Sequence, residues 1–392
     1  MQILTFIQFY IPGYKSGGPV RSLSNIVKLL NNHFKFSIFT SDRDFSDFIK
    51  YSEVESEKWN YFPIQKIYYS IANISSVLFF LCKEHNRQYD ILYLNSFFSL
   101  RFSIIPVIYF SLFKPTTKIL IAPRGEFSEG ALRLKLFKKT IFIFLFKNFY
   151  EKLNIYWHST SKLESHDISR VFKKGLNSRF IPNLFIAPNL TDIPSKRFDG
   201  RHTLECKLKV TFISRINAKK NLLFALELLT NIDLSIEFTI IGPIDDLSYW
   251  NKCKRIINKL PKNISVVIKK PIDHDLIIKE FSMYDLFLFP TLGENFGHVV
   301  IEALSAGTSV IVGEKVPWPN CENGTLTKLE LNIKVWKKSL LTWYDAYQRN
   351  VMEFRNNAYK YALRNQSSNE DLLLTKNMFN SFLSLNTSDT NN

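Results

Sequence analysis

Residues 286–312 read LFLFPTLGENFGHVVIEALSAGTSVIV, with an apolar run at each end and a helical pattern between them. The runs Leu286–Phe289 and Ser309–Val312 have the length of buried strands, and the helical pattern begins at Gly297. A strand, a helix and a second strand with this spacing form a crossover unit with parallel strands. The stretch therefore predicts an α/β fold.

The same alternation continues on both sides of this stretch. Further strands are expected at Ile3–Phe9, Phe36–Thr40, Ile91–Asn95, Lys118–Ala122, Lys209–Ile213, Ile236–Ile241 and Ile264–Ile268. Helical patterns lie between them at Val20–Leu30, Phe97–Phe113, Asn221–Leu229, Tyr249–Lys259 and Asp275–Ser282. This order predicts two doubly wound domains that face each other across a cleft, with ligands bound beyond the carboxyl ends of the strands.

A change in composition marks the boundary between the two predicted domains. Pro188, Pro194 and Gly200 stand among polar residues without periodicity, which predicts a linker over residues 183–206. The N-terminal domain then covers residues 1–182 and the C-terminal domain residues 207–340. Residues 341–392 form a C-terminal helical segment that could pack back on the first domain.

The composition is that of a folded protein with an excess of positive charge. Of the 392 residues, 46% are hydrophobic and 22% are charged, which excludes wholesale disorder. Lys and Arg number 51 against 35 Asp and Glu, so the formal net charge is +16. This charge favours phosphorylated substrates, anionic membrane surfaces or other polyanions as partners.

No metal site, export signal or membrane-spanning helix is expected from the sequence. The four cysteines lie far apart, in no spacing that suits zinc, as in a reduced cytosolic protein: Cys82, Cys206, Cys253 and Cys321. The apolar N-terminus lacks a basic region and a cleavage site. Arg101 interrupts the apolar run from Phe97 to Phe113, which favours a buried helix over a transmembrane one.

Two carboxylates follow the strand Leu286–Phe289. Glu294 lies between Gly293 and Gly297, in a loop at the carboxyl end of the sheet, where we expect it to be exposed to a cleft. Glu302 lies about one turn into the following helix, in an apolar stretch where a carboxylate needs hydrogen-bond donors such as sugar hydroxyls. A solvent-facing Glu302 and an ordinary loop acid at Glu294, favoured by the helix dipole, remain the simpler alternatives.

Two basic residues, Arg215 and Lys220, follow the first strand of the second half. Two cations beside a helix N-terminus suit a diphosphate, although a solvated turn is the simpler alternative. In the first half, Gly17 and Gly18 precede Pro19, so their backbone amides could approach a phosphate or a sugar closely. A tight turn without a ligand is the alternative there.

In their order along the chain, these features resemble the retaining glycosyltransferases of family 4, which have the GT-B fold of two Rossmann-like domains. The motifs that carry the resemblance are Gly17-Gly18, Ala122-Pro-Arg-Gly-Glu, His158-Ser-Thr-Ser-Lys-Leu-Glu, Ile181-Pro-Asn, Arg215 with Lys220, Ile241-Gly242, Glu294 with Glu302, Ala306-Gly307-Thr and Pro317-Trp318-Pro319. Ser214, Asn221 and Lys270 stand where the family usually has Gly, which leaves the nucleotide base open.

The resemblance implies a set of site residues. The implied donor-binding residues are Arg215, Lys220, Glu294, Phe296, Gly297, Glu302, Gly17 and Gly18. In this set Glu294 contacts the donor sugar, Glu302 contacts the ribose, and the two cations bind the diphosphate. Arg124 occupies the turn in which many relatives carry a histidine, and with Glu294 it is the expected catalytic residue.

The resemblance also implies the reaction, which is transfer of a sugar from a UDP- or GDP-sugar to a glycan or a lipid-linked acceptor, with retention and without a metal or other cofactor. Synthesis of a bacterial surface polysaccharide, such as lipopolysaccharide O-antigen or capsule, is the expected setting. A sugar-nucleotide epimerase or a glycosyl phosphorylase with the same layout is the enzymatic alternative. A basic nucleic-acid-binding protein is the non-enzymatic one, although no recognised module for it is present.

A basic and apolar segment, Leu132–Lys147, suggests where the acceptor is met. It combines cations with bulky apolar residues, as a helix on an anionic membrane surface does. A core helix with solvated lysines is the alternative. The first interpretation predicts a cytoplasmic protein that is peripheral at the inner face of the membrane.

Overall fold

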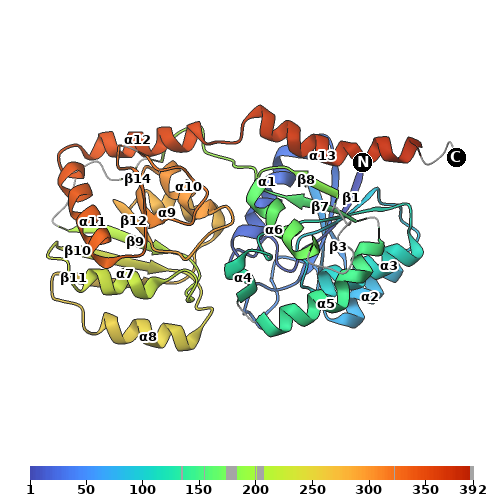
Figure 1. Cartoon of the computed structure of the whole chain (residues 1–392), viewed down its shortest axis with the longest axis horizontal. Helices are drawn as coiled ribbons and strands as arrows, with labels where there is room; N and C mark the ends of the chain where they lie inside the picture. The colour runs from blue at the N-terminus through green and yellow to red at the C-terminus, as the bar shows by residue number, and fades with distance from the viewer. Residues whose placement is uncertain are drawn as a thin grey trace. The chain divides into compact units, whose positions relative to one another are not determined.

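The computed structural model describes residues 1–133, 136–153, 155–173, 183–198, 200, 207–321 and 323–388 (Figure 1). The chain divides into two compact units. Unit 1 comprises Met1–Leu190 and Ser367–Asn392, and unit 2 comprises Thr191–Gln366. Each unit is built on one sheet with helices on both faces (Figure 1).

The sheet of unit 1 has the strand order β3-β4-β2-β1-β5-β6-β7-β8. Its strands are β1 (Gln2–Phe6), β2 (Lys35–Ser41), β3 (Trp59–Phe62), β4 (Gln65–Ser70), β5 (Ile91–Leu94), β6 (Lys118–Ile121), β7 (Ile155–Ser159) and β8 (Asn183–Ile186). Neighbouring strands are parallel except β3 and β4, which are antiparallel. The chain moves from β1 to one edge and then returns to β5, so the order reverses between β1 and β5.

Helices cover both faces of the unit 1 sheet. They are α1 (Gly18–Leu30), α2 (Ile74–Lys83), α3 (Ile105–Phe113), α4 (Glu129–Arg133), α5 (Leu136–Lys152), α6 (Lys162–Lys173) and α13 (Asn369–Ser388). Buried residues of α1 and α13 form one core cluster, and those of α2, α3, α5 and α6 form another. The single helix predicted over Phe97–Phe113 is instead a π-helical turn, Leu100–Ile104, that leads into α3.

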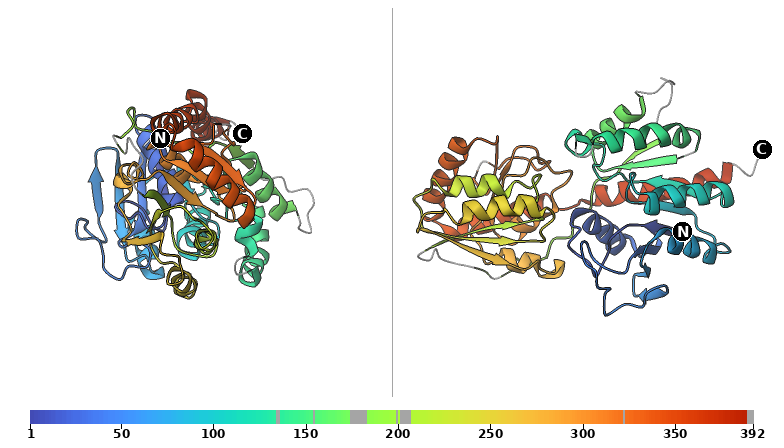
Figure 2. Two further views of the ribbon diagram at one scale, coloured as in Figure 1. Left: turned by 90° about the vertical axis from the view of Figure 1, so that its left-hand side faces the viewer. Right: turned by 90° about the horizontal axis from the view of Figure 1, so that it is seen from below.

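The last helix, α13, lies against unit 1, as Figure 2 also shows. The ring of Phe379 lies 5.2 Å from that of Phe34 and 5.6 Å from that of Tyr93, and Phe382 lies 4.8 Å from Tyr156. The predicted C-terminal helical segment, residues 341–392, is therefore divided between the two units. Its first part belongs to unit 2, and α13 completes unit 1.

The structure places a strand in the segment for which a linker was predicted. Asn183–Ile186 forms β8, which pairs in parallel with β7. The strand is only four residues long and ends two residues before Pro188, so in sequence it resembles a loop, which explains the difference. The boundary between the units lies at Leu190 and Thr191. Residues 199 and 201–206 of the predicted linker, and Ile181 and Pro182, lie outside the described residues.

The sheet of unit 2 is parallel throughout, with the order β11-β10-β9-β12-β13-β14. Its strands are β9 (Leu208–Ile213), β10 (Ile236–Ile241), β11 (Ile264–Lys269), β12 (Leu286–Phe289), β13 (Ser309–Gly313) and β14 (Leu326–Leu329). The chain proceeds from β9 towards one edge and from β12 towards the other. The order therefore reverses between β9 and β12, at the position where such sheets bind ligands.

The helices of unit 2 pack in two layers (Figure 1). They are α7 (Leu222–Leu229), α8 (Leu247–Ile257), α9 (Ile277–Phe281), α10 (His298–Ser305), α11 (Ile333–Tyr347) and α12 (Val351–Arg364). Helices α9, α10 and α12 lie together above the sheet in Figure 1, and α7 and α8 lie below it. Unit 2 extends beyond residue 340 because α12 packs on α10 and β13.

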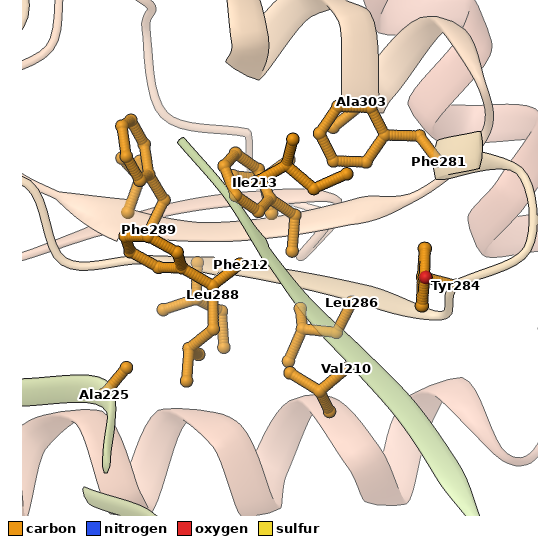
Figure 3. Packing of buried hydrophobic residues seen from close by; sticks show 14 of the residues in the cluster. Val210, Phe212, Ile213, Ala225, Phe281, Tyr284, Leu286, Leu288, Phe289 and Ala303 are labelled. Carbon is orange, nitrogen blue, oxygen red and sulfur yellow. The ribbon is translucent and has the colours of Figure 1, made fainter. Parts of the chain in front are cut away.

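The centre of unit 2 is mainly apolar. Figure 3 shows side chains of β9 and β12 packed with Phe281 of α9 and Ala303 of α10. Val210, Phe212 and Leu288 are at most 1% exposed. This core fixes the ends of β9 and β12 beside each other, and the loops that follow these strands carry the residues singled out in the sequence.

Candidate functional site

The loops that follow β9 and β12 meet at the reversal point of the unit 2 sheet. The backbone N–H of Leu292 donates to the carbonyl of Lys219 at 2.9 Å, and the Thr291 hydroxyl oxygen lies 3.3 Å from the same carbonyl oxygen. These contacts tie the first loop, which carries Lys220, to the second, which carries Glu294. Two of the residues predicted for a donor site therefore come together.

Lys220 and Glu294 form an ion pair. The ammonium of Lys220 lies 2.6 Å from Oε1 of Glu294, and the side chains are only 13% and 11% exposed. The Thr291 hydroxyl donates to the same carboxylate oxygen at 2.8 Å. The expectation that Glu294 is exposed is therefore wrong, because the loop turns its carboxylate onto Lys220.

The charge of Glu294 follows from its surroundings. Burial by itself would raise the pKa of the Glu294 carboxyl group. The ammonium groups of Lys220 and Lys219 and the hydrogen bond from Thr291 outweigh burial, so that the pKa lies below its usual range. Glu294 is ionised at neutral pH as a result, and its charge is balanced by Lys220.

The glycine loop between β12 and α10 has a defined shape. Gly297 has a φ of 77° and immediately precedes α10. The Trp318 indole N–H donates to the Gly297 carbonyl at 3.2 Å, and the Phe296 ring lies 4.7 Å from the Trp318 ring. A Cβ atom at Gly297 would lie 3.4 Å from the Cβ of Glu294. Phe296 and Gly297 are thus held at the N-terminus of α10, beside Glu294.

Arg215 lies in the same loop as Lys220 but has a different carboxylate near it. Its Nη1 is 3.6 Å from Oδ2 of Asp245, and the two side chains are 34% and 23% exposed. Gly242 permits the close approach of the two strand ends, since a Cβ there would lie 2.0 Å from the Ser214 carbonyl oxygen. Sequence analysis missed Asp245, which lies in a turn without a recognisable pattern.

Glu302 is buried rather than solvent-facing, which excludes the simpler alternative for this residue. It is 6% exposed, and its Oε1 lies 3.0 Å from Nε2 of His274. His274 begins a short 3-10 turn, His274–Leu276, before α9. Sequence analysis missed His274 as well. The only sequence feature that pointed to such a partner was Glu302 itself, because a carboxylate in an apolar helix needs a hydrogen-bond donor.

In unit 1, the Gly17-Gly18 loop follows β1 at the reversal point of that sheet. Gly17 has a φ of 77°, which favours glycine, and a Cβ at either position would meet nothing within 4 Å. The Asp44 carboxylate accepts hydrogen bonds from the backbone N–H groups of Tyr14 at 2.8 Å and Lys15 at 3.0 Å. The loop is thereby fastened to the end of β2, with open space around its two glycines.

Arg124 follows β6 and is held by neutral groups. It donates to the Tyr93 hydroxyl at 2.7 Å, to Oδ1 of Asn95 at 2.9 and 3.2 Å, and to Oδ1 of Asn189 at 3.0 Å. Its φ is 54°, a left-handed conformation that is unfavourable for a side chain of this size. These four hydrogen bonds hold the guanidinium in place, and they help to stabilise a backbone conformation at Arg124 that is unfavourable by itself.

His158 lies behind Arg124 in the same network. Its Nε2 lies 2.9 Å from the Ala187 carbonyl, which requires an N–H at Nε2, and its Nδ1 therefore accepts from the Tyr93 hydroxyl at 2.7 Å. Burial, followed by the positive charge of Arg124, lowers the pKa of His158 to about 3. His158 is therefore a neutral structural group that orients Tyr93, and Tyr93 in turn accepts from Arg124.

The predicted site residues fall into one set in each unit. Gly17, Gly18 and Arg124 belong to unit 1, and the remaining donor-site residues belong to unit 2. Among the described residues, no three His, Cys, Asp or Glu side chains gather in a way that could hold a metal ion. Cys206 lies outside the described residues.

Part of the chain matches a known protein family. Residues 196–361 match the family model of glycosyl transferases group 1. No curated protein is similar enough in sequence to be identified as a relative. Sucrose-phosphate synthase from Thermosynechococcus elongatus has a similar structure, with a TM-score of 0.75, 15% identity, and coverage of 98% of this chain and 99% of that one.

Two further structures are similar over nearly their whole length. Anabaena HepE in complex with UDP-glucose has a TM-score of 0.67 and 14% identity, with coverage of 98% of this chain and 100% of that one. The lipopolysaccharide outer core galactosyltransferase WaaB has a TM-score of 0.57 and 14% identity, with coverage of 98% and 99%. At these identities the likeness shows the fold, which is the GT-B arrangement of two Rossmann-like domains predicted from the sequence.

Proposed function

We propose that the chain, whose family match and fold indicate a glycosyltransferase, transfers a sugar from a UDP- or GDP-sugar to a glycan or lipid-linked acceptor. The observation that carries the proposal is the Lys220–Glu294 pair at the reversal point of the unit 2 sheet. A balanced pair of opposite charges can offer its cation to a phosphate and its carboxylate to sugar hydroxyls when a donor enters.

The diphosphate, the sugar and the ribose of the donor each have a suitable partner in unit 2. Lys220 and Arg215 supply positive charge for the diphosphate, with the amides of Phe296 and Gly297 at the N-terminus of α10 beside them. Glu294 accepts hydrogen bonds from the sugar, and Glu302 accepts them from the ribose. From unit 1, Gly17 and Gly18 offer backbone amides with open space around them.

The proposed reaction resembles that of family 4 and retains the anomeric configuration. The bond from the anomeric carbon to the phosphate oxygen breaks, and the acceptor oxygen forms a new bond on the same face of the sugar. The acceptor proton passes to the leaving phosphate. Lys220 and Arg215 stabilise the negative charge that grows on that phosphate, a role that a divalent metal plays in other enzymes. No metal or other cofactor is therefore needed.

Two residues are assigned catalytic roles in this mechanism. Glu294, which is held by Lys220 and Thr291 before a donor binds, positions the sugar and does not attack it, because in this reaction the acceptor oxygen is the nucleophile. Arg124 is the catalytic candidate of unit 1, since its guanidinium is positively charged and the described hydrogen-bond partners of that group are neutral. That charge would favour the diphosphate as it leaves.

We further propose that the acceptor is met at an anionic membrane surface, in the synthesis of a bacterial surface polysaccharide. Helix α5 carries inward residues such as Phe142 in the core cluster, but it also exposes Phe137 by 78% and Phe144 by 77%. Leu112 of α3 is 69% exposed on the same helical layer. Large exposed apolar residues beside lysines suit the interface of an anionic bilayer. Leu134 and Lys135 of the predicted segment lie outside the described residues.

The described residues contain no helix that is both long enough and apolar enough to cross a bilayer. The proposal places the protein in the cytoplasm, peripheral at the inner face of the membrane. Flotation with anionic liposomes at low salt tests it, with Phe137→Ser/Phe144→Ser as the variant and Leu163→Ser, on α6, as the control. Absence of binding by the wild-type protein would remove the membrane from the proposal.

Thermal stabilisation by a panel of UDP- and GDP-sugars tests the donor assignment, because a ligand that binds the folded state raises its melting temperature. One nucleotide class should stabilise the wild-type protein, and Arg215→Ala/Lys220→Ala should abolish the shift. Transfer should survive EDTA, and its loss with recovery on adding a divalent ion would contradict the metal-free mechanism. Epimerisation without an acceptor, or cleavage that needs phosphate, would replace transfer by the alternative reactions.

A further inference from the structure

The pair between His274 and Glu302 joins two separate elements of unit 2. His274 lies in the connection from β11 to α9, and Glu302 lies in α10 after β12. Nε2 of His274 is 3.0 Å from Oε1 of Glu302, with the two side chains 26% and 8% exposed. The histidine is therefore the more accessible partner of a nearly buried carboxylate.

The backbone on both sides of this pair is fixed. The Asp273 side chain accepts a hydrogen bond from the Asp275 N–H at 3.2 Å, which caps the turn that begins at His274. The turn leads into α9, whose Ile278 and Phe281 are buried, and α9 packs against α10. The position of the imidazole relative to Glu302 is thus set by packed helices.

The chemistry of the pair leaves room for a ligand. An imidazole Nε2–H can donate to a carboxylate in the neutral and the protonated form of histidine. A carboxylate has about four lone-pair positions, so a bond at Oε1 limits its rotation and still allows other donors to bind. A hydroxyl pair such as that of a ribose is the kind of donor that an oriented carboxylate recognises.

We propose that His274 is a positioning residue that holds the Glu302 carboxylate in the orientation needed to accept the ribose hydroxyls of the nucleotide. The inference rests on the proposed function, in which Glu302 contacts the ribose, and it adds a residue outside the set of motifs that suggested that function. A histidine that only satisfies a buried carboxylate would affect folding stability and leave ribose recognition unchanged.

The test measures the affinity of UDP and GDP by calorimetry for the wild-type protein, His274→Ala and His274→Gln. With the nucleotide that binds, His274→Ala should raise Kd about 10-fold, the effect of losing one charge-assisted hydrogen bond. His274→Gln keeps an N–H donor and should recover most of the affinity. In turnover, the Ala variant should raise the donor KM by a similar factor and leave kcat within about 2-fold.

A nucleotide without ribose hydroxyls separates positioning from a general structural effect. The 2′,3′-dideoxy diphosphate should bind the wild-type protein about 10-fold more weakly than the ordinary nucleotide. It should bind His274→Ala no more weakly than it binds the wild-type protein. Glu280→Gln is the matched control, because it weakens another close pair of unit 2, Lys269–Glu280 at 2.7 Å, and should leave nucleotide affinity unchanged.

The outcomes distinguish this inference from the proposed function. Two results would overturn the role of His274 and leave the function standing. One is that His274→Ala binds the nucleotide with wild-type affinity. The other is that removing the ribose hydroxyls weakens binding by the same factor in His274→Ala as in the wild-type protein. If His274→Ala does not fold, His274→Leu, which is closer in size to histidine and also lacks a donor, replaces it in the same comparison with the dideoxy nucleotide. If neither UDP nor GDP binds the wild-type protein, the proposed function itself fails.

Discussion

Lys220 of unit 2 and Arg124 of unit 1 are both cations that follow a strand at the carboxyl edge of a parallel sheet, but their partners differ in charge. Lys220 lies 2.6 Å from the carboxylate of Glu294. Arg124 donates only to neutral oxygens among its described partners, those of Tyr93, Asn95 and Asn189. Lys220 is paired directly with an anion, whereas the Glu164 carboxylate near Arg124 accepts a hydrogen bond from the N–H of Gly125 and not from the guanidinium.

The difference shows how much the partners decide the role of a basic residue. A balanced pair can open when a ligand brings its own phosphates and hydroxyls, because each member exchanges one partner for another. Arg124 cannot move without losing four hydrogen bonds, so it acts as a fixed charge, and its field contributes to the low pKa of His158. Four predictions test this contrast.

The largest expected effect is on the exchangeable pair. Glu294→Ala should lower kcat/KM by about 10³-fold or more, since it removes the group that positions the donor sugar. Circular dichroism and the melting temperature should show that the variant remains folded, and Glu294→Gln serves as the variant of equal size. Turnover at the wild-type rate in Glu294→Ala would contradict the assignment of Glu294.

The fixed cation should affect stability in addition to turnover. Arg124→Ala loses four hydrogen bonds and should lower the free energy of unfolding by about 2–4 kcal/mol in urea titrations. Arg124→Gly loses the same bonds but adopts the φ of 54° easily, so it should be about 1 kcal/mol more stable than the Ala variant. If the Arg124→Ala protein unfolds at the same urea concentration as the wild-type protein, the hydrogen bonds of Arg124 contribute nothing to stability.

The pH dependence of the stability of unit 1 is expected to reflect the positive charge of Arg124. Burial and Arg124 lower the pKa of His158 to about 3, whereas an unfolded histidine has a pKa near 6.5. Between these values the unfolded state binds one more proton, so stability falls with decreasing pH by at most about 1.4 kcal/mol per pH unit. His158→Gln should lose less stability between pH 7 and pH 5. Equal losses, measured by hydrogen exchange in β5 and β7, would contradict a neutral buried histidine.

The smallest effect is expected at Arg215, which lies 3.6 Å from the carboxylate of Asp245 with both side chains partly exposed. Asp245→Asn removes a competitor for the arginine, and should tighten nucleotide binding by no more than about 3-fold, because such pairs are weak. Calorimetry with UDP or GDP measures the change. A loss of affinity would show that Asp245 holds Arg215 in its binding position.

Much of the fold could be predicted from the sequence because buried parallel strands appear as continuous apolar runs. The strands missed were β3, β4, β7, β8 and β14. Of these, β3, β8 and β14 are four residues long and lie at sheet edges, and the interior strands β4 and β7 include polar residues, Gln65 and Lys66 in β4 and His158 in β7. The division of the C-terminal helices between two units depends on packing, which no local pattern contains.

The candidate site was only partly predictable. Lys220 and Glu294 could be identified from their loops, but their bond joins residues 74 positions apart and depends on the order of strands. His274 and Asp245 lie in turns without periodicity, and only their distance to Glu302 and Arg215 reveals them. Residue types and spacing therefore suggested the chemistry, whereas the pairing of charges required the structure.

The return of the chain to unit 1 through α13 affects how the protein is made. A ribosome releases residues 1–190 first, then all of unit 2, and only afterwards the helix that brings Phe379 and Phe382 onto Phe34, Tyr93 and Tyr156. Until that point the nascent unit 1 presents part of an aromatic surface to water or to chaperones. The first part to be translated is therefore the last to be completed, and unit 2 has the opportunity to fold before it.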